Sequence, residues 1–322
     1  MDRNLVLNLG RVTEAAALAC AKYLGKGDKN MADQAAVDGM RRMFDTLDID
    51  GVVVIGEGEM DEAPMLYIGE KIGRAGADDL KVDIAVDPVD GTTSVANGLP
   101  NAISVVAVAP RGCLLHAPDT YMKKIAVGPR AKGVIDIHKS ASENIRNVAE
   151  ALGKSLDEIT VEVLDRPRHD ELIKEIRATG ARIKLVSDGD VLSAISTCFE
   201  YTGVDITMGI GGAPEGVITA VALKCLGGDF QGILAPANEE HRARCIEMGA
   251  ELDRVYYLDD LAKGNKLSFA ATGVSYGELL DGVKYMKDNT ASTHTLILRS
   301  ETGTIRFIKS IHKLDKKPDY AK

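Results

Sequence analysis

Two kinds of hydrophobic pattern alternate along the first half of the chain. Apolar residues recur at helical spacing over residues 4–24 and 32–47, which predicts two amphipathic helices. A shorter helix is expected over residues 65–72, with Glu70 on its exposed side. Apolar runs rich in β-branched residues predict buried strands at 51–55, 82–87, 101–108 and 122–127. The first half is therefore expected to pack helices on a mostly antiparallel sheet.

The pattern changes near Gly153. Ser140 and Glu143 have the spacing of a capping box, which opens a helix that Gly153 closes. The segments that follow are predicted as strands at 160–164, 182–186, 204–208 and 267–271, helices at 169–179, from 191 onward, 214–226, 239–248 and 276–285, and a hairpin of 293–298 with 305–311. Strands that alternate with helices are typical of an α/β layer. We therefore expect two domains, residues 1–153 with an α+β fold and residues 154–322 with an α/β fold.

Composition narrows the class of protein. The chain has 322 residues, of which 45% are hydrophobic and 27% charged, so it can bury a sizeable core. A net charge of -9, the absence of Trp and only 4% aromatic residues argue against nucleic acid as a partner. No apolar run approaches the length of a membrane span, and no signal-peptide pattern opens the chain. Five widely spaced cysteines without a Cys-x-x-Cys pair predict a cytoplasmic location.

Acidic residues follow two neighbouring predicted strands. The strand at 82–87 ends in Asp87 and Asp90, with Gly91 and Thr92 directly after them. The strand at 51–55 runs into Glu57 and further acids. An ordinary acidic turn would explain one such end, but two neighbouring ends are unlikely to arise by coincidence. Carboxylate oxygens suit Mg²⁺ or Mn²⁺, so the spacing predicts a divalent metal site.

Three polar clusters end successive strands of the second half. They are Arg166–Arg168, Asp188–Asp190 and the glycine-rich turn Gly209–Glu215. Ligands of α/β sheets bind beyond the carboxyl ends of the strands, so these clusters predict a binding site. The arginines suit a phosphate or are surface charge, and the aspartates suit sugar hydroxyls or are turn and cap residues. The glycine-rich turn opens a helix and offers backbone N–H groups.

Several motifs together resemble one family of phosphatases. The segment Asp87–Thr92 resembles the signature of the metal-dependent, lithium-sensitive sugar phosphatases, which include inositol monophosphatases and fructose-1,6-bisphosphatases. The further segments that resemble the bacterial class II fructose-1,6-bisphosphatases are Gly25–Asn30, Val54–Glu59, Asp61–Glu70, Arg166–His169, Ser187–Asp190 and Gly209–Gly216. The likeness runs from about Leu5 to His312, and one departure is Asp90, where many members carry Glu.

The resemblance implies a fold and an activity. The fold is a five-layer α-β-α-β-α sandwich with the active site in the cleft between two sheets, the first domain binding metal and the second binding substrate. The activity is hydrolysis of the 1-phosphate of fructose 1,6-bisphosphate, a reaction of gluconeogenesis, with two or more Mg²⁺ or Mn²⁺ ions. The family also implies a homodimer or homotetramer, which the apolar first helix permits.

The resemblance further assigns roles to individual residues. The metal ligands it implies are Asp33, Glu57, Asp87, Asp90 and Glu215, with Asp33 and Glu57 around one cation. The catalytic residues it implies are Asp33, Glu57 and Thr92, with Thr92 orienting the attacking water. The substrate-binding residues it implies are Lys29, Asp90, Gly91, Thr92, Tyr121, Arg166, Pro167, Arg168, Asp188, Gly189, Asp190 and Gly212.

Each role competes with a structural interpretation. On spacing alone, Asp33 and Glu215 complement helix dipoles. Thr92 is otherwise a turn hydroxyl, Tyr121 a core residue, and Lys29 a solvated loop lysine.

Other functions remain open at this point. Sedoheptulose 1,7-bisphosphate or inositol monophosphate would suit the same machinery, although paired arginines favour a bisphosphate. A dinucleotide-dependent oxidoreductase is a remote alternative, because Gly209, Gly211 and Asp229 follow part of that fingerprint but Pro214 occupies the third glycine position. A non-enzymatic metal- or sugar-binding module is equally remote.

Overall fold

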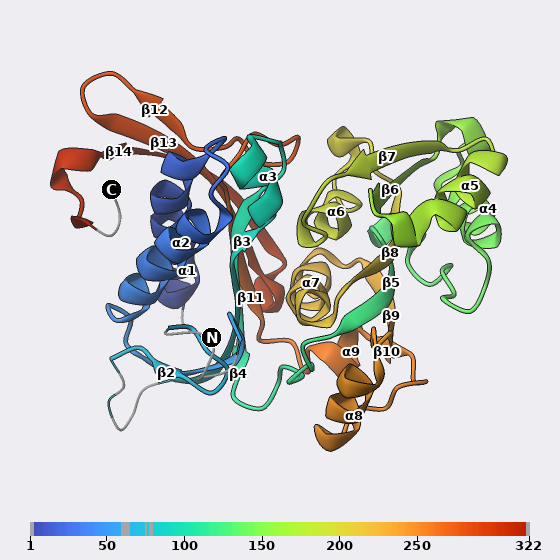
Figure 1. Ribbon diagram of the computed structural model, residues 1–322, viewed down its shortest axis with the longest axis horizontal. Helices are drawn as coiled ribbons and strands as arrows, with labels where there is room; N and C mark the ends of the chain where they lie inside the picture. Colours follow the sequence, from blue (N-terminus) through green and yellow to red (C-terminus); the bar gives the residue numbers. More distant parts are fainter. Residues whose placement is uncertain (1–2, 59–64, 75, 77–79, 320–322) are drawn as a thin grey trace. The chain divides into compact units, whose positions relative to one another are not determined.

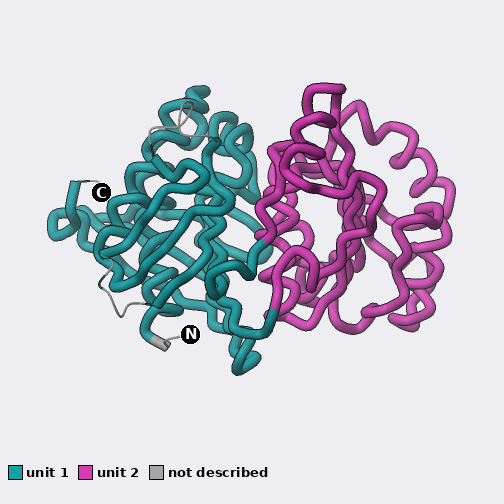
Figure 2. The backbone as a smooth tube through the Cα atoms, turned by 90° about the horizontal axis from the view of Figure 1, so that it is seen from below, with its two compact units in different colours: residues 1–114, 264–322 teal, residues 115–263 magenta. Residues whose placement is uncertain are grey.

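The chain divides into two compact units. The computed structural model describes residues 3–58, 65–74, 76 and 80–319. One unit comprises residues 1–114 and 264–322, and the other comprises residues 115–263 (Figure 2). The division predicted at Gly153 falls inside the second unit, and the last part of the chain returns to the first. Local sequence patterns do not report which distant strands pair, so they could not show this return.

Within the described residues, the first unit contains an eight-stranded sheet. Its strands are β1 (Ile49–Ile55), β2 (Lys71–Ile72), β3 (Leu80–Asp90), β4 (Ile103–Pro110), β11 (Ser268–Gly273), β12 (Lys284–Met286), β13 (Thr290–Arg299) and β14 (Thr304–Lys313). The order is β12-β13-β11-β4-β3-β1-β2, with β14 paired to β13. Strands β1 and β3 are parallel and the other pairs are antiparallel, so the prediction of a mostly antiparallel sheet is confirmed.

Helices α1 (Arg3–Cys20) and α2 (Lys29–Phe44) cover one face of this sheet (Figure 1). Their apolar stripes join the sheet in one core, in which Leu9, Met40 and Phe44 are fully buried. This confirms the two predicted helices. A short helix, α3 (Thr92–Asn97), follows β3.

Two predicted helices of this unit are wrong. Over the described part of 65–72, the chain forms turns and the strand β2, and Leu66 has a positive φ of 57°. Residues 276–285 form bends and the start of β12. Both stretches contain apolar residues at helical spacing, but the backbone is taken up by strand pairing and turns.

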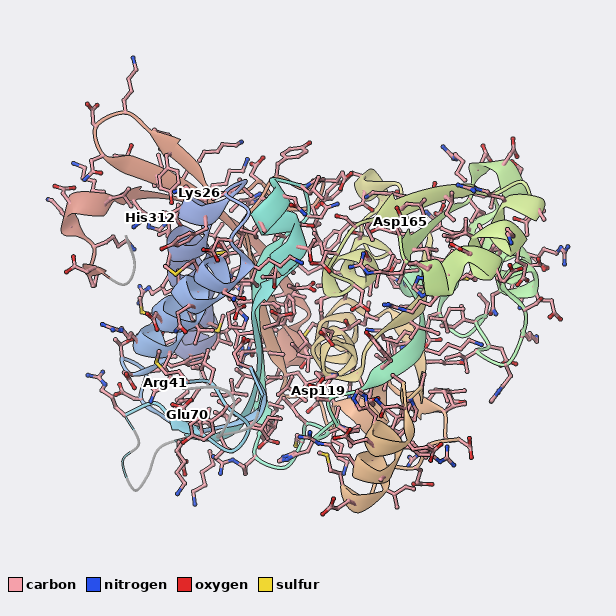
Figure 3. The ribbon with its side chains drawn as sticks, in the orientation of Figure 1. Lys26, Arg41, Glu70, Asp119, Asp165 and His312 are labelled. Atoms are coloured by element: carbon pink, nitrogen blue, oxygen red, sulfur yellow. The ribbon has the colours of Figure 1, made fainter. Side chains whose placement is uncertain are left out.

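Glu70 is a further correction, because its side chain is buried and not on the surface. The residue is 8% exposed. Its carboxylate pairs with the guanidinium of Arg41 on α2 and accepts a hydrogen bond from the backbone N–H of Leu66 (Figure 3). The carboxylate therefore ties the loop after β1 to α2.

The second unit contains a six-stranded sheet in its described residues. Its strands are β5 (Tyr121–Val127), β6 (Thr160–Leu164), β7 (Arg182–Val186), β8 (Ile206–Gly212), β9 (Asp229–Leu234) and β10 (Tyr256–Tyr257). The order is β10-β9-β5-β8-β6-β7. Strands β8, β6 and β7 are parallel, which confirms the predicted α/β layer, and the other pairs are antiparallel.

Helices cover both faces of the second sheet (Figure 1). The helices are α4 (Ala141–Leu152), α5 (Asp170–Ala178), α6 (Val191–Ser196), α7 (Ala213–Leu226), α8 (Glu239–Glu247) and α9 (Leu258–Leu261). Helices α4 and α5 lie on one face, and α6 and α7 on the other. The predicted capping box is confirmed, because Ser140 Oγ accepts from the N–H of Glu143 and the Ser140 N–H donates to Glu143 Oε2 at 3.1 Å.

Short 3₁₀ turns connect several of these elements. They are Ala21–Tyr23, Pro129–Ala131, Leu156–Glu158, Pro167–His169, Glu200–Thr202, Ser300–Thr302 and Leu314–Lys316. The fold is a mixed α/β structure with two mixed sheets. Among the described residues, no helix combines the length and the apolar character needed to cross a bilayer.

Candidate active site

A bulge at the end of β3 holds the first pair of acids. Asp87 pairs with Val105 of β4 and Asp90 pairs with Ile103, so β3 contains one extra residue between them. The strand therefore continues through Pro88 to Asp90, where the sequence had suggested a turn. Asp87 Oδ1 accepts from the backbone N–H of Val89 at 2.9 Å, and Asp90 is 4% exposed. Bulges re-aim side chains, and this one lies between the two acidic residues Asp87 and Asp90.

Gly91 ends the strand and starts α3. Its φ is 106°, and a Cβ there would lie 3.2 Å from Ala102 Cα, so only glycine fits without strain. Thr92 Oγ1 donates to Val89 O at 3.1 Å, which folds the turn back on the bulge. Lys29 Nζ donates to Thr93 Oγ1 at 2.9 Å. The turn thus brings Lys29, predicted to meet a phosphate, to the start of α3.

Asp33 and Glu57 lie in contact with each other. Because β1 runs parallel to β3 and Ile55 pairs with Ala85, Glu57 follows β1 at the sheet edge that carries Asp87. The Asp33 carboxyl, on α2, makes a hydrogen bond with Glu57; burial raises the pKa of Asp33, and this hydrogen bond only partly opposes the rise. Two carboxyl groups in contact need a proton or a cation between them, and an all-oxygen pair suits a hard divalent cation. Residues 59–64 of this acidic segment lie outside the described residues.

In the second unit, the two arginines at the end of β6 are held differently. Arg166 Nη1 donates to Ser187 O at 2.5 Å, and Nη2 pairs with Asp188 Oδ1 at 3.0 Å. Arg168 donates from Nε and Nη2 to Ile210 O, at 3.0 and 2.8 Å. Its guanidinium lies over the Tyr121 ring, 4.8 Å from the centroid. Tyr121 is 40% exposed, so it is not the core residue that the sequence also allowed.

Pro167 and Gly189 shape the backbone between these side chains. Pro167 opens the 3₁₀ turn that leads from β6 into α5, and this turn separates Arg166 from Arg168. Gly189 has a φ of 75°, in the left-handed region that favours glycine. It lies between Asp188 and Asp190 and turns the chain from β7 into α6.

Lys124 is a buried cation that the sequence analysis did not select. It lies on β5, is 9% exposed, and its Nζ contacts Asp190 Oδ2 at 2.5 Å and Gly212 O at 2.9 Å. Lys124 lies on the same face of β5 as the buried Met122 and Ala126, whereas the adjacent Lys123 is exposed, and this alternation was the available signal. Lys124 fixes Asp190 and leaves its buried Oδ1 without a hydrogen-bond partner.

Glycines beside these acids make room for carboxylates. A Cβ on Gly211 would lie 1.8 Å from Asp190 Oδ2, and a Cβ on Gly212 would lie 1.8 Å from Glu215 Oε2. Burial raises the pKa of Glu215, and nearby Lys124 only partly offsets this. Glu215 Oε2 is buried without a hydrogen-bond partner. An acid in that state is suited to a cation, which supplies the missing partner.

The predicted site residues divide between the two units. Lys29, Asp33, Glu57 and the bulge belong to the first unit, whereas Tyr121, the arginines, Asp188–Asp190, Gly212 and Glu215 belong to the second. The contacts described above each lie within one unit. Within the described ranges, no group of three or more His, Cys, Asp and Glu side chains is arranged to hold a metal ion. The set that joins Asp87 and Asp90 with Glu215 draws on both units and stays a prediction.

Comparison with known proteins matches nearly the whole chain. The family described as bacterial fructose-1,6-bisphosphatase, glpX-encoded, matches residues 3–312. Fructose-1,6-bisphosphatase 1 class 2 of Escherichia coli (strain K12) is 50% identical over 330 aligned positions, which cover 98% of this chain and 97% of the relative. The fructose-1,6-bisphosphatase class 2 of Shigella flexneri has the same identity and coverage.

Proposed function

The chain belongs to the family of bacterial, glpX-encoded fructose-1,6-bisphosphatases, and from this premise we propose how its residues carry out the reaction. Its activity is that of a class II fructose-1,6-bisphosphatase, which hydrolyses fructose 1,6-bisphosphate to fructose 6-phosphate and phosphate, a reaction of gluconeogenesis. The roles of individual residues, the metal ions and the assembly are the parts that we infer.

The observation that carries the metal proposal is the contact of Asp33 with Glu57. The two carboxyl groups lie at the edge of the first sheet that also carries Asp87, and burial raises the pKa of Asp33. We assign Asp33 and Glu57 to one divalent cation, and Asp87, Asp90 and Glu215 to another. Mg²⁺ or Mn²⁺ bound to such ligands supplies positive charge that lowers the pKa of water and neutralises phosphoryl oxygens. The ligand set contains only carboxylate oxygens, which suits both ions.

Thr92 orients the attacking water. Its hydroxyl hydrogen is committed to Val89 O at 3.1 Å, so its oxygen is left to accept a hydrogen bond. A water that donates to this oxygen turns a lone pair away from Thr92 and toward the phosphorus. Asp33 and Glu57 act as acid–base groups in the same reaction. The phosphate group that is released is held by Asp90, Gly91 and Thr92.

The second unit holds the sugar and the distal phosphate. Arg168 is fixed on Ile210 O and Tyr121, so its guanidinium is positioned before the substrate arrives. Arg166 and Pro167 complete the phosphate site. The sugar hydroxyls donate to the carboxylates of Asp188 and Asp190 and lie beside Gly189 and Gly212. Lys29 of the first unit binds the reacting phosphate.

The architecture that we propose follows the family resemblance. The two units would form a five-layer α-β-α-β-α sandwich with the active site in the cleft between the sheets. Each sheet and its covering helices supply the layers that this arrangement requires.

Release of phosphate from several sugar phosphates tests the proposed function directly. We expect turnover of fructose 1,6-bisphosphate with Mg²⁺ or Mn²⁺, and none after chelation with EDTA. Sedoheptulose 1,7-bisphosphate, inositol 1-phosphate and fructose 6-phosphate complete the substrate panel and separate a bisphosphatase from a general phosphatase. Turnover that is unaffected by EDTA would contradict the metal assignment, and equal turnover of the monophosphates would contradict the paired-arginine site.

We also propose that the protein assembles with copies of itself as a dimer or tetramer. Among the described strands, β14 pairs with β13 alone and carries Ile305, Phe307 and Ile311 with exposed fractions of 44%, 40% and 75%. An exposed row of apolar side chains is typical of an association surface. Light scattering should give a multiple of the chain mass, and Ile311→Lys should reduce it, whereas Ile246→Lys on α8 should not. A single-chain mass for the unaltered protein would contradict the proposal.

The cytoplasm is the location that we propose, because all five cysteines are unbridged. Thiols persist in reducing compartments. Recovery of the tagged protein in the periplasmic fraction of a bacterial host would contradict this location.

A further inference from the structure

One buried imidazole connects the strand end that carries the arginines to a neighbouring strand. His169 is 1% exposed, and its Nδ1 lies 2.7 Å from Leu164 O, the last residue of β6. Its Nε2 lies 2.7 Å from the backbone nitrogen of Ile210 on β8. A backbone N–H can only donate, so Nε2 must accept and the ring proton must reside on Nδ1. The geometry therefore requires one neutral tautomer of His169.

The chain makes room for this imidazole with a glycine. Gly209 has a φ of 150°, and a Cβ there would lie 3.0 Å from His169 Nε2 and 3.1 Å from its Cε1. Any larger residue would push the ring away from Ile210. Gly209 lies within β8, where the sequence had suggested a turn, and the close approach of strand and ring explains why a glycine is needed there.

Ile210 is held from both sides by consecutive side chains. Its N–H donates to His169, and its carbonyl oxygen accepts both the Nε and the Nη2 of Arg168. The same guanidinium stacks on Tyr121. The position of Arg168 therefore depends on Ile210, and the position of Ile210 depends on an unprotonated Nε2.

We propose that His169 is a positioning residue for substrate binding, which acts by holding Ile210 so that Arg168 is aimed at the distal phosphate. This inference rests on the proposed function, in which Arg168 binds that phosphate. His169 does not touch the substrate in this account. It sets affinity for the sugar phosphate and leaves the chemistry at the reacting phosphate to the first unit.

Protonation of His169 breaks this arrangement. A proton on Nε2 replaces the acceptor with a second donor, which faces the Ile210 N–H. Arg166 and Arg168 disfavour the imidazolium ion, Asp190 favours it, and Lys124 from β5 lines the same cavity of about 30 Å³. Burial is the largest influence and lowers the pKa of His169 below its ordinary 6.5. Substrate affinity should therefore hold at neutral pH and fall as the pH drops through this lowered value.

Three substitutions separate the two hydrogen bonds. In His169→Gln, the side-chain oxygen reaches the position of Nε2 and keeps an acceptor for Ile210. In His169→Asn, the amide reaches the position of Nδ1 and keeps the bond to Leu164 O. His169→Phe fills the volume and makes neither bond. The exposed His138 provides a matched control, His138→Gln.

Binding of fructose 6-phosphate to the protein in EDTA tests the proposal without metal or turnover. By titration calorimetry at pH 7.5, we expect Kd to rise about tenfold for His169→Phe and His169→Asn, because both lose the hydrogen bond from the Ile210 N–H. His169→Gln and His138→Gln should stay within about threefold of the unaltered protein. In turnover with Mg²⁺, KM should follow Kd while kcat changes less than threefold.

The pH profile gives a second, independent readout. The ratio of the Kd of the unaltered protein to that of His169→Gln should rise as the pH falls from 7.5 through the lowered pKa of His169, because only one of them carries an imidazole. Titration of the phosphate itself is common to both proteins and cancels in the ratio. A constant ratio would overturn the proposal, and this measurement needs only the Gln variant to fold.

Each possible outcome decides a different question. If Arg168→Ala leaves Kd unchanged, the assignment of Arg168 in the proposed function fails. If Arg168→Ala weakens binding but His169→Phe does not, the positioning role of His169 fails while the proposed function stands. If all three His169 variants lower the melting temperature and leave Kd unchanged, His169 is structural only.

Discussion

The predicted site acids of the two units are held in opposite ways. In the first unit, Asp33 makes its hydrogen bond with another carboxyl group, that of Glu57, and burial raises its pKa. In the second unit, Asp188 pairs with Arg166 and Asp190 pairs with Lys124. The site carboxylates thus lie beside another carboxyl group in the first unit and beside fixed cations in the second.

This difference teaches how a site can divide binding from chemistry. Carboxylates beside carboxylates are stabilised when a cation arrives, so the first unit is suited to metal. Carboxylates beside fixed cations are already neutralised, so the second unit is suited to holding guanidinium groups and sugar contacts in place. Glu215 is the exception in the second unit, because burial raises its pKa despite Lys124.

Replacing a carboxylate of the first unit should have the largest effect. Asp87→Ala removes a proposed metal ligand from the bulge, and we expect kcat for fructose 1,6-bisphosphate to fall by roughly a thousandfold or more, since electrostatic stabilisation of the transition state is the larger part of catalysis. Phosphate release with Mg²⁺ measures it. Asp48→Asn is the matched control, because Asp48 pairs with Arg74 on the surface of the same unit. An Asp87→Ala enzyme with full activity would contradict the proposal that the carboxylates of the first unit bind the catalytic metal.

Replacing a cation of the second unit should change affinity more than rate. Arg168→Ala should raise KM by roughly 10- to 100-fold with a smaller change in kcat, because a hydrogen bond to a charged group contributes about 1.5–3 kcal/mol. Steady-state kinetics separate the two constants. Arg182→Ala is the control, since Arg182 also donates to a backbone carbonyl, Glu158 O at 2.6 Å, but lies outside the polar clusters. A fall in kcat without a change in KM would mean that Arg168 acts in the chemical step and not in substrate binding.

Glu215→Gln should stabilise the metal-free protein while it removes activity. The folded-state pKa of Glu215 is raised above its ordinary 4.5, so its contribution to stability is present below that value and is lost as the pH rises through the folded value. In EDTA, the variant should melt higher than the unaltered protein at pH 8, by about 2–4 °C per kcal/mol recovered, and the gap should close toward pH 4.

Glu143→Gln provides a control with the opposite sign. Hydrogen bonds with Ser140 hold the pKa of Glu143 below its ordinary value, so its contribution is present above that value and is lost as the pH falls. This variant should melt lower than the unaltered protein at pH 8, and the difference should shrink in acid. Thermal melts in EDTA at pH 4, 6 and 8 measure both. Equal shifts in the same direction would mean that the two carboxylates do not differ as described.

Lys29→Met should have the smallest effect. Its ammonium donates to Thr93 Oγ1 and is exposed, so solvent screens it. We expect KM to rise by about two- to fivefold. Lys26→Met, at an exposed lysine in the loop that precedes α2, is the control and should leave KM unchanged. A tenfold effect would make Lys29 a principal phosphate ligand of the first unit.

Elements with strong local signals could be predicted from sequence. Strands β6 and β7 match the predicted residues, and the helix that begins with the Ser140–Glu143 capping box ends at Gly153 as expected, with a φ of 66°. Each of these signals lies within a few residues of the element that it specifies. The acids at the end of β3 were also visible in the sequence, although the bulge between Asp87 and Asp90 replaces the expected turn and depends on pairing with β4.

Features that depend on distant pairing could not be predicted. The helix expected at 276–285 is wrong because those residues lead into β12, which pairs with β13. Lys124 and His169 were not selected, since their partners Asp190 and Ile210 lie more than 40 positions away along the chain. A sequence shows which residues are suited to chemistry, whereas their partners become visible only when the sheets are assembled.

The return of the chain to its first unit has a consequence for biosynthesis. Strand β11 lies between β4 and β13, so the first sheet is interrupted until residues beyond 268 have left the ribosome. The second unit, residues 115–263, is complete before that point. The nascent polypeptide therefore finishes its inserted portion while the host portion still lacks its middle strand, and the unit that carries Asp33, Glu57 and Asp87 is the last to become whole.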